Sequence, residues 1–280
     1  MRIFRDAAKL QKWCMQQKRM GKRMALVPTM GYLHEGHLSL IETAKKNRAD
    51  EIVVSVFVNP VQFGPNEDYA TYPRNEKSDL AKCRKAGASA VFLPTPEAMY
   101  APDHSVYVNE ERLSTGLCGA RRPGHFRGVC TVVAKLFNLA QPDFAVFGQK
   151  DFQQAAVINR MVRDINFPVE IVVAPIVREE SGLAKSSRNT YLSDAEKASA
   201  LAIFASLRET AGAVAEKGSV PWKSQKARIV RKLEKAGLKV DYAEAVDAAT
   251  LEDVKTLKPG NAVLVAAFAG RTRLIDNIIV

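Results

Sequence analysis

Five short apolar runs alternate with amphipathic segments over the first part of the sequence, and this alternation constrains the fold more than any other feature. Strand-like runs separated by helical segments are typical of βαβ units, in which helices cover a parallel sheet. The run VVSVFV at 53–58 is apolar at almost every position, as in a central parallel strand that is buried on both faces. The predicted strands are 24–28, 51–58, 88–93, 144–147 and 169–173, and the predicted helices lie near 36–49, 75–87, 128–140 and 152–165.

The sequence changes character after Arg178. A polar segment at 179–189 is followed by two helical segments and then by runs that alternate as strands do. The helical segments lie at about 194–217 and 222–236, and the strand-like runs are 240–246, 262–270 and the final RLIDNIIV. We therefore expect an α/β fold with a Rossmann-like parallel sheet and helices on both faces over 1–178, and a smaller C-terminal α+β lid domain over 179–280.

Composition and charge exclude several classes of protein. With 47% hydrophobic and 25% charged residues, the chain lies in the range of ordinary globular proteins. No apolar run approaches the roughly 20 residues that span a bilayer, and no signal-peptide pattern is visible, so we expect a cytoplasmic protein without membrane contact. The four cysteines form no C-x-x-C pair, which argues against a zinc site and a disulfide framework. The net charge of +11 is spread along the chain without interleaved aromatic residues, so we expect no nucleic-acid partner.

The strongest local signal is a pair of histidines in the segment ALVPTMGYLHEGHLSL. His34 and His37 follow a predicted strand and lie at the start of a predicted helix, with Gly36 between them. Side chains three residues apart on a helix share a face, and the unpaired N–H groups at a helix N-terminus favour an anion. Imidazole can donate N–H without an obligatory charge, so the pair suits a nucleotide phosphate. Two surface histidines or a zinc site are the other interpretations, although no further ligand lies nearby at the usual zinc spacing.

A second signal is the polar segment EESGLAKSSRN, which follows the last strand predicted for the first domain. Lys185 offers a point charge and Arg188 a bidentate fork. Ser186 and Ser187 between them offer hydroxyl and backbone donors, so the segment suits a departing pyrophosphate. A basic, serine-rich segment is by itself more often a solvated linker, and only its pairing with the histidine motif favours a phosphate-binding loop.

This pairing resembles the H-I-G-H and K-M-S-K-S motifs of the nucleotidyltransferase superfamily that includes the class I aminoacyl-tRNA synthetases. Within that superfamily, the sequence is most similar to the pantothenate synthetase (pantoate–β-alanine ligase) family. The segments that carry the resemblance are PTMGYLHEGH (28–37), FVNPVQF (57–63), RPGHFRGV (122–129), FGQKDFQQ (147–154) and GLAKSSRN (182–189). Five motifs in the family's order, spread over essentially the whole chain, make a chance match implausible.

The resemblance implies an ATP-dependent ligase of coenzyme A biosynthesis. In the family, the carboxylate of pantoate attacks the α-phosphate of ATP, which gives pantoyl adenylate and pyrophosphate. The amine of β-alanine then attacks the acyl carbon, which gives pantothenate and releases AMP, with no covalent enzyme intermediate. The implied cofactor is ATP with Mg²⁺, the implied partners are the small-molecule substrates ATP, pantoate and β-alanine, and the implied assembly is a homodimer.

The resemblance also implies roles for individual residues. The catalytic residues would be His37, His34 and Lys150, and pantoate would be bound by Gln62 and Gln154, with Arg122 and His125 lining the same site. The ATP-binding residues would be Met30, His34, His37, Gly148, Lys150, Asp151, Val177, Lys185, Ser186, Ser187 and Arg188. Simpler interpretations remain open: Gln62 could cap a turn, Lys150 and Asp151 could be an exposed pair at a helix start, and Arg122 could be a surface cation.

The sequence departs from the family pattern at two positions. Lys185 stands where the family commonly has Met or Leu, so it would add a phosphate contact. In YPRNEKSDL, where family members can carry adjacent acidic residues that help hold magnesium, only Asp79 remains, beside Ser78. The metal ligands are therefore unassigned, and magnesium would be held mainly by phosphates and water, as this ion prefers.

Two rival functions stay open from the sequence. An adenylyltransferase of the same superfamily would leave AMP in its product, whereas a ligase releases AMP when an amine is added. A non-catalytic RNA-binding relative of a tRNA synthetase would bind RNA in a salt-dependent manner without exchanging pyrophosphate into ATP.

Overall fold

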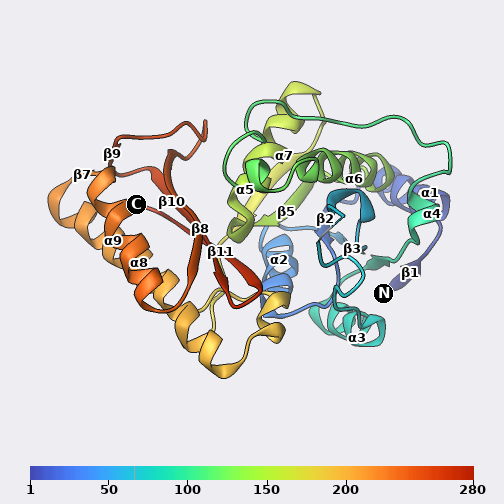
Figure 1. Cartoon of the computed structure of the whole chain (residues 1–280). Coiled ribbons are helices and arrows are strands. Elements are labelled where there is room, and N and C mark those ends of the chain that lie inside the picture. The colour runs from blue at the N-terminus through green and yellow to red at the C-terminus, as the bar shows by residue number, and fades with distance from the viewer. Residues whose placement is uncertain (66) are drawn as a thin grey trace. The chain divides into compact units, whose positions relative to one another are not determined.

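The computed structural model describes residues 1–65 and 67–280 (Figure 1). The chain forms two compact units, the first made of Met1–Gly148 with Val157–Ala174 and the second of Gln149–Ala156 with Pro175–Val280. The predicted boundary after residue 178 falls inside the second unit, and the division into a nucleotide-binding domain and a lid stays a prediction. None of the described helices is long and apolar enough to cross a membrane.

The first unit is built on a sheet of six parallel strands in the order β1-β4-β3-β2-β5-β6. The strands are β1 (Arg2–Phe4), β2 (Met24–Thr29), β3 (Glu51–Val56), β4 (Ala90–Phe92), β5 (Phe144–Gly148) and β6 (Glu170–Ala174). From β2 the chain adds β3 and β4 on one side and β5 and β6 on the other. Sheets of this kind bind ligands at the carboxyl ends of the strands where the order reverses, which here is the end of β2 and β5.

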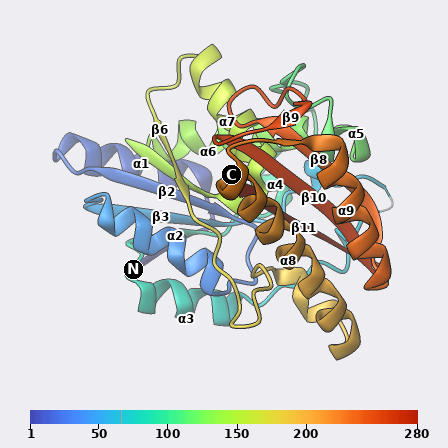
Figure 2. The ribbon, with the colours of Figure 1, turned by 90° about the vertical axis from the view of Figure 1, so that its left-hand side faces the viewer.

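Helices cover both faces of this sheet, as predicted (Figures 1 and 2). The helices of this unit are α1 (Ala7–Arg19), α2 (Glu35–Lys46), α3 (Glu76–Ala86), α4 (Pro96–Met99), α5 (Leu117–Arg121), α6 (His125–Ala140) and the part of α7 (Phe152–Asp164) from Val157 on, with the 3₁₀ turn η1 (Pro60–Gln62). Helices α2 and α3 pack on one face, where they share a core with Val27 and Val54. Helices α1 and α6 lie on the other. Leu26 and Val53, whose side chains alternate with those two, are also buried, so both faces of β2 and β3 are covered.

The first strand and the first helix were not predicted from the sequence. Strand β1 has only three residues and pairs with β4, so it is too short to show a periodic pattern. Helix α1 begins at Ala7 and is capped by Asp6, whose side chain accepts from the N–H of Lys9. Because β1 was missed, the sheet has six strands where five were predicted. All four cysteines are buried and none takes part in a disulfide, and burial raises the pKa of Cys83 to about 12.

The second unit is the small α+β module that the sequence predicts. Its elements are the 3₁₀ turn η2 (Gln149–Asp151), the start of α7 up to Ala156, η3 (Ser187–Tyr191), α8 (Asp194–Lys217), β7 (Val220–Pro221), α9 (Trp222–Lys235), β8 (Lys239–Asp247), β9 (Thr256–Leu257), β10 (Asn261–Ala269) and β11 (Thr272–Ile279). Strands β8, β10 and β11 form an antiparallel sheet in the order β11-β10-β8, so β11 lies at an edge. Helix α8 packs against β10 and β11, and α9 packs against β8. Leu207, Leu233 and Val265 are fully buried between these helices and the sheet.

Candidate active site

The segment between β2 and α2 carries the histidine motif and has an unusual backbone. Gly31 and Tyr32 both have positive φ angles, of 83° and 50°. A Cβ atom on residue 31 would lie 2.9 Å from Cγ1 of Val56 and 3.1 Å from Oδ2 of Asp79, so the position requires glycine. For a residue other than glycine, such a conformation costs about 1–3 kcal/mol and persists only when its surroundings hold it. Contacts around Tyr32 must therefore stabilise this segment.

Asp79 and Lys82 of α3 supply those contacts. The backbone N–H of Tyr32 donates to Oδ2 of Asp79 at 2.8 Å, and the N–H of Leu33 donates to Oδ1 at 2.7 Å. Lys82 donates from Nζ to the carbonyl oxygen of Leu33 at 2.5 Å. Burial raises the pKa of Asp79, and the two N–H donors oppose that rise. Both carboxylate oxygens are bonded to the backbone, so Asp79 positions the loop. Among the described residues, no group of three or more His, Cys, Asp or Glu side chains could hold a metal ion.

The histidines cap α2, which the sequence did not predict. His34 is the N-cap residue, with extended backbone angles, and not a residue of the first turn. Its Nδ1 accepts from the N–H of Gly36 at 3.1 Å, and Nδ1 of His37 accepts from the N–H of His34 at 3.3 Å. The N–H of His37 donates to the carbonyl oxygen of His34 at 2.8 Å. The prediction that unpaired helix amides meet the anion is therefore wrong for Gly36 and His37.

The capping bonds determine which nitrogen of each ring carries the hydrogen. A nitrogen that accepts a hydrogen bond has no proton, so in the neutral rings of His34 and His37 the hydrogen is assigned to Nε2. The ring centroids lie 4.1 Å apart and the ring planes are inclined by 38°. The pair therefore presents Nε2–H donors from two adjacent rings, just beyond the carboxyl end of β2.

Gln62 ends the short turn η1, which follows β3. The residue is buried, with 7% of its surface exposed. Its Oε1 accepts from Nδ2 of Asn59 at 3.1 Å, and its Nε2 donates to Sδ of Met30 at 3.2 Å. Asn59 caps the turn through the N–H of Val61 and also receives a hydrogen bond from the hydroxyl of Tyr100 at 2.8 Å. Asn59 is therefore the capping residue, and the amide of Gln62 is held beside Met30, another residue of the predicted site.

His125 holds the backbone of Gln62, and Arg122 in turn holds His125. Arg122 donates to both carboxylate oxygens of Glu67, at 2.7 and 2.6 Å, and from NH1 to Nε2 of His125 at 2.9 Å. Since a guanidinium can only donate, Nδ1 of His125 carries the hydrogen and donates to the carbonyl oxygen of Gln62 at 2.9 Å. Burial alone would raise the pKa of Glu67, but the hydrogen bonds and charge of Arg122 outweigh it and lower that pKa. Arg122 is thus half of a largely buried ion pair and not a surface cation.

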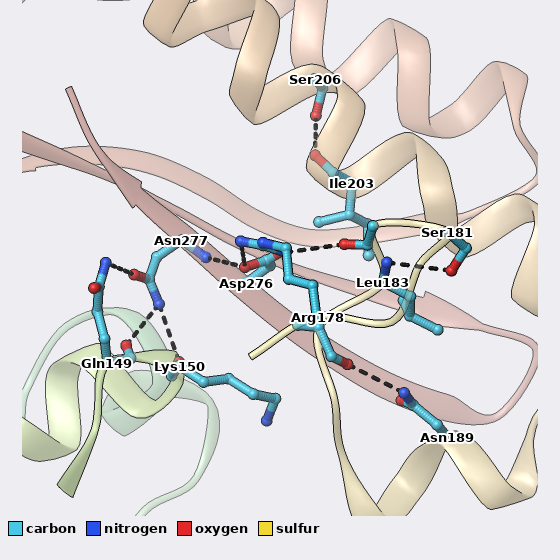
Figure 3. A network of polar contacts seen from close by, with 12 residues as sticks. Gln149, Lys150, Arg178, Ser181, Leu183, Asn189, Ile203, Ser206, Asp276 and Asn277 are labelled. Atoms are coloured by element: carbon cyan, nitrogen blue, oxygen red, sulfur yellow. Dashed lines mark hydrogen bonds and ion pairs between the residues drawn. The ribbon is translucent and has the colours of Figure 1, made fainter. Parts of the chain in front are cut away.

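In the second unit, the turn η2 carries Lys150 and Asp151. Asn277 of β11 holds this turn, because its Nδ2 donates to the carbonyl oxygens of Gln149 and Lys150 at 2.9 and 3.0 Å (Figure 3). The side chain of Gln149 donates back to Oδ1 of Asn277 at 3.2 Å. Asp151 is exposed and Lys150 is partly exposed, so the backbone of the turn is fixed while its charged groups remain accessible.

The predicted phosphate-binding loop of the second unit is held by backbone and side-chain bonds. The N–H of Lys185 donates to the carbonyl oxygen of Val177 at 2.9 Å, which joins two residues of the predicted ATP site. Ser186 caps η3 by accepting from the N–H of Arg188 at 3.3 Å. Asn189, 7% exposed, donates to Glu179 and to the carbonyl oxygen of Ala184. The segment is therefore a folded loop and not a solvated linker.

The sequence matches the Pantoate-beta-alanine ligase family over residues 2–279. The chain belongs to the pantoate–β-alanine ligase family. A pantothenate synthetase of Clostridium novyi is 54% identical over 272 residues, which are 96% of this chain and 95% of that protein. A pantothenate synthetase of Myxococcus xanthus is 50% identical over 99% of this chain and 95% of that one.

Solved structures of the same family have the same fold. The crystal structure of pantothenate synthetase from Thermus thermophilus superposes with a TM-score of 0.91 at 42% identity and covers 100% of this chain and 99% of that chain. The pantoate–β-alanine ligase of Francisella tularensis, solved in complex with "Beta-gamma ATP" and β-alanine, gives a TM-score of 0.84 at 31% identity, with 100% and 97% coverage. These matches confirm the predicted family and fold class.

Within this family member, each unit gathers a part of the predicted site. The first unit holds Met30, His34, His37, Gln62 and Gly148, in the segments that follow β2 and β3 and at the end of β5, and the second holds Lys150, Asp151, Gln154, Val177, Lys185, Ser186, Ser187 and Arg188. Their roles in binding stay predictions. Sequence reasoning assigned no role to Asn59, Glu67, Asp276 and Asn277. Asn59 lies inside a motif that carried the resemblance, and Asp276 and Asn277 lie in the final RLIDN, so motif membership was the signal that could have found three of the four.

Proposed function

We propose that this chain joins pantoate to β-alanine in two steps at the expense of ATP. In the first, a carboxylate oxygen of pantoate attacks the α-phosphorus, the bond to the β-phosphate oxygen breaks, and pyrophosphate leaves. In the second, the amine of β-alanine attacks the acyl carbon of pantoyl adenylate, loses a proton and displaces AMP. The observation that carries the proposal is the capped histidine pair at the carboxyl end of β2, in a chain that matches the ligase family from end to end.

The histidine pair fits the adenylation step as a donor of hydrogen bonds. Pantoate is already a carboxylate, so no general base is needed to activate it, and the protein has mainly to position the reactants and stabilise charge. The Nε2–H groups of His34 and His37 would bond the oxygens of the α-phosphate as negative charge builds there. Lys150 would stabilise the same phosphates as a point charge.

Gln62 and Gln154 would select pantoate. A primary amide both donates and accepts, so it can bind the hydroxyl and the carboxylate of one small molecule. The thioether of Met30 is a weak acceptor, so the Nε2 group of Gln62 can exchange that contact for a pantoate oxygen with little loss. The bond from Asn59 to Oε1 keeps the amide in one orientation during the exchange.

The remaining predicted residues would bind ATP. The nucleotide would be contacted largely through the backbone of Met30, Gly148 and Val177. Asp151 would belong to the ATP site as the acidic neighbour of Lys150. In the loop of the second unit, Lys185, Ser186, Ser187 and Arg188 would bind the phosphates that leave as pyrophosphate. Magnesium would arrive with ATP and be held by phosphates and water. We further propose that the protein works in the cytoplasm as a homodimer, as the family resemblance implies.

Two measurements test the proposal. The protein should exchange labelled pyrophosphate into ATP only when pantoate is present, and it should release AMP when β-alanine is then added. A product that keeps its AMP would favour an adenylyltransferase, and binding of RNA without any exchange would favour the non-catalytic alternative.

A substitution tests the histidine role within the same assay. His37→Ala should lower the rate of adenylate formation by about 10²–10³-fold, the cost of removing one transition-state donor. Rapid-mixing measurement of the first turnover reads this rate directly. A variant that forms the adenylate as fast as the wild type would exclude His37 from the step.

A further inference from the structure

Two successive residues of the edge strand β11, Asp276 and Asn277, reach two different segments of the second unit (Figure 3). Side chains of neighbouring strand residues point to opposite sides. Asp276 bonds Arg178, at the start of the loop that carries Lys185 to Arg188, and Asn277 bonds the turn that carries Lys150. Both side chains are buried, at 5% and 2% exposed for the whole residues, so neither contacts solvent to any extent.

The side chain of Asn277 makes three hydrogen bonds, all to the turn η2. Its two amide hydrogens satisfy the carbonyl oxygens of Gln149 and Lys150, and its oxygen accepts from the side chain of Gln149. A side chain with two donors and an acceptor in one plane is needed for this pattern, which only Asn and Gln provide. The side chain of Asn277 therefore holds the main chain of the turn at Lys150. This contact does not depend on the direction of the Lys150 ammonium group.

Asp276 fixes the other segment through Arg178. The guanidinium donates from NH1 to Oδ2 at 2.6 Å and from NH2 to Oδ1 at 2.9 Å, a bidentate pair. Arg178 also donates to the carbonyl oxygen of Gly182 at 3.2 Å and stacks over the ring of Phe204, with 3.5 Å from Cζ to the centroid. Oδ1 of Asp276 further accepts from the N–H of Asn277 at 2.8 Å, which satisfies an amide of the edge strand.

Internal hydrogen bonds connect the two arms of the loop that begins at Arg178. Arg178 and Ala184 form an antiparallel bridge, and the N–H of Lys185 donates to the carbonyl oxygen of Val177. At the other end of the loop, Nδ2 of Asn189 donates to Oε1 of Glu179 at 3.0 Å. Fixing Arg178 therefore fixes the backbone that carries Lys185 to Arg188, because bonds between the two arms connect them.

We propose that Asp276 and Asn277 are positioning residues for the adenylation step. Through them a single strand sets the spacing between the turn that carries Lys150 and the loop that carries Lys185 and Arg188. Donors and charges that are already in place lose no energy to reorganisation when charge develops on the phosphates. The inference rests on the proposed function, since it assigns these three cations to the phosphates of ATP. Neither Asp276 nor Asn277 would touch a substrate, since each acts through the segment that it holds.

The isosteric variant Asn277→Asp tests the inference. A carboxylate of the same size cannot donate, so it would repel the carbonyl oxygens of Gln149 and Lys150 and displace the turn. Pantoate-dependent pyrophosphate exchange should fall about 100-fold, the cost of misplacing a catalytic group by roughly 1 Å. Supplied pantoyl adenylate and β-alanine should still give AMP within about 2-fold of the wild-type rate, because pyrophosphate has already left. Asp276→Asn, which keeps its shape and loses its charge, should show the same split to a smaller extent.

Asp241→Asn is the matched control. It breaks the ion pair between Asp241 of β8 and Arg273 of β11. The side chains of that pair are 14% and 19% exposed, and those of Asp276 and Arg178 are 4% and 17% exposed, so both pairs are largely buried. It should lower the midpoint of thermal unfolding without separating the two half-reactions. Equal loss of both half-reactions in Asn277→Asp, or no loss in either, would overturn the inference. A wild-type protein without exchange would instead refute the proposed function, and this inference with it.

Discussion

Helix α6 packs against the turn that carries Gln62 at a glycine, and this contact can be tested by adding one methyl group. A Cβ atom on residue 128 would lie 2.5 Å from the carbonyl oxygen of Val61 and 2.6 Å from both N and Cα of Gln62. Favourable contacts between such atoms begin near 3.5 Å, so Gly128→Ala requires a movement of about 1 Å. All three atoms belong to the backbone, so no rotamer change can relieve the overlap. The turn itself must retreat.

The expected cost follows from this overlap. Overpacking of a close contact destabilises by about 1–3 kcal/mol. At about 2.1 cal/mol/K of unfolding entropy per residue, a chain of 280 residues loses about 1.7 °C of unfolding midpoint per kcal/mol, so Gly128→Ala should lower the midpoint by roughly 2–5 °C. Gln62 moves with the turn, so kcat/KM for pantoate should fall by up to about 100-fold. The KM for ATP should change far less, because Gln62 is assigned to pantoate.

Gly212→Ala provides the control, since it makes the same substitution inside another helix. Apart from the neighbouring backbone of α8 itself, no atom lies within 4 Å of the Cβ position at residue 212. There the alanine should stabilise by about 0.5–1 kcal/mol, because glycine loses more freedom on folding. Calorimetry and steady-state kinetics with pantoate and ATP varied in turn give both comparisons. An unfolding midpoint for Gly128→Ala as high as that of Gly212→Ala would refute the packing argument. Equal rises in the two KM values would refute the link to pantoate.

Three further substitutions separate structural from chemical roles. His34→Asn should keep the unfolding midpoint, because Asn is a preferred N-cap, but should slow adenylate formation by about 10²-fold for want of the Nε2 donor; an unchanged rate would contradict that role. Glu67→Gln should lower the unfolding free energy by about 1–3 kcal/mol at neutral pH. The folded pKa of Glu67 lies below its unfolded value, so this difference should vanish as the pH falls through the folded pKa; denaturant titrations that give a constant difference would exclude the ion pair. Asp79→Asn leaves one loop amide without its acceptor, so the KM for ATP should rise more than the KM for β-alanine, and equal KM changes would argue against loop positioning.

The sequence predicted the elements that have a clear period and missed those defined by single contacts. The run at 53–58 shows that β3 is a buried interior strand because nearly every residue is apolar. Strand β1 has no such pattern, since three residues at a sheet edge need only backbone pairing. Helix α3 was found within a residue at each end, as its cap Asn75 and the left-handed Gly87 are standard signals.

Site residues that lie inside a recognisable motif were predicted. The residues that hold them in place were missed where the two partners are far apart in the sequence. Gln62 was identified from its motif, but Glu67 and Arg122, which support it, are 55 residues apart. Asn277 lies 127 residues from Lys150, and no local pattern records that contact. Spacing can suggest that two side chains share a helix face, whereas a bond between distant segments depends on how the sheet and loops bring them together.

The spacing of the histidine motif also has a different cause from the one the sequence suggested. In a capping box, the residue at the third helical position is the one whose side chain reaches back to the N–H of the N-cap residue. His37 occupies that position and His34 is the N-cap, so the separation of three residues is required by the cap. In each ring Nδ1 is the acceptor of the capping bond, so Nε2 is the nitrogen that remains to donate. If the pair binds the α-phosphate as we propose, the capping bonds hold both Nε2 donors in place before charge develops there, so no energy is lost to reorganisation during the transfer.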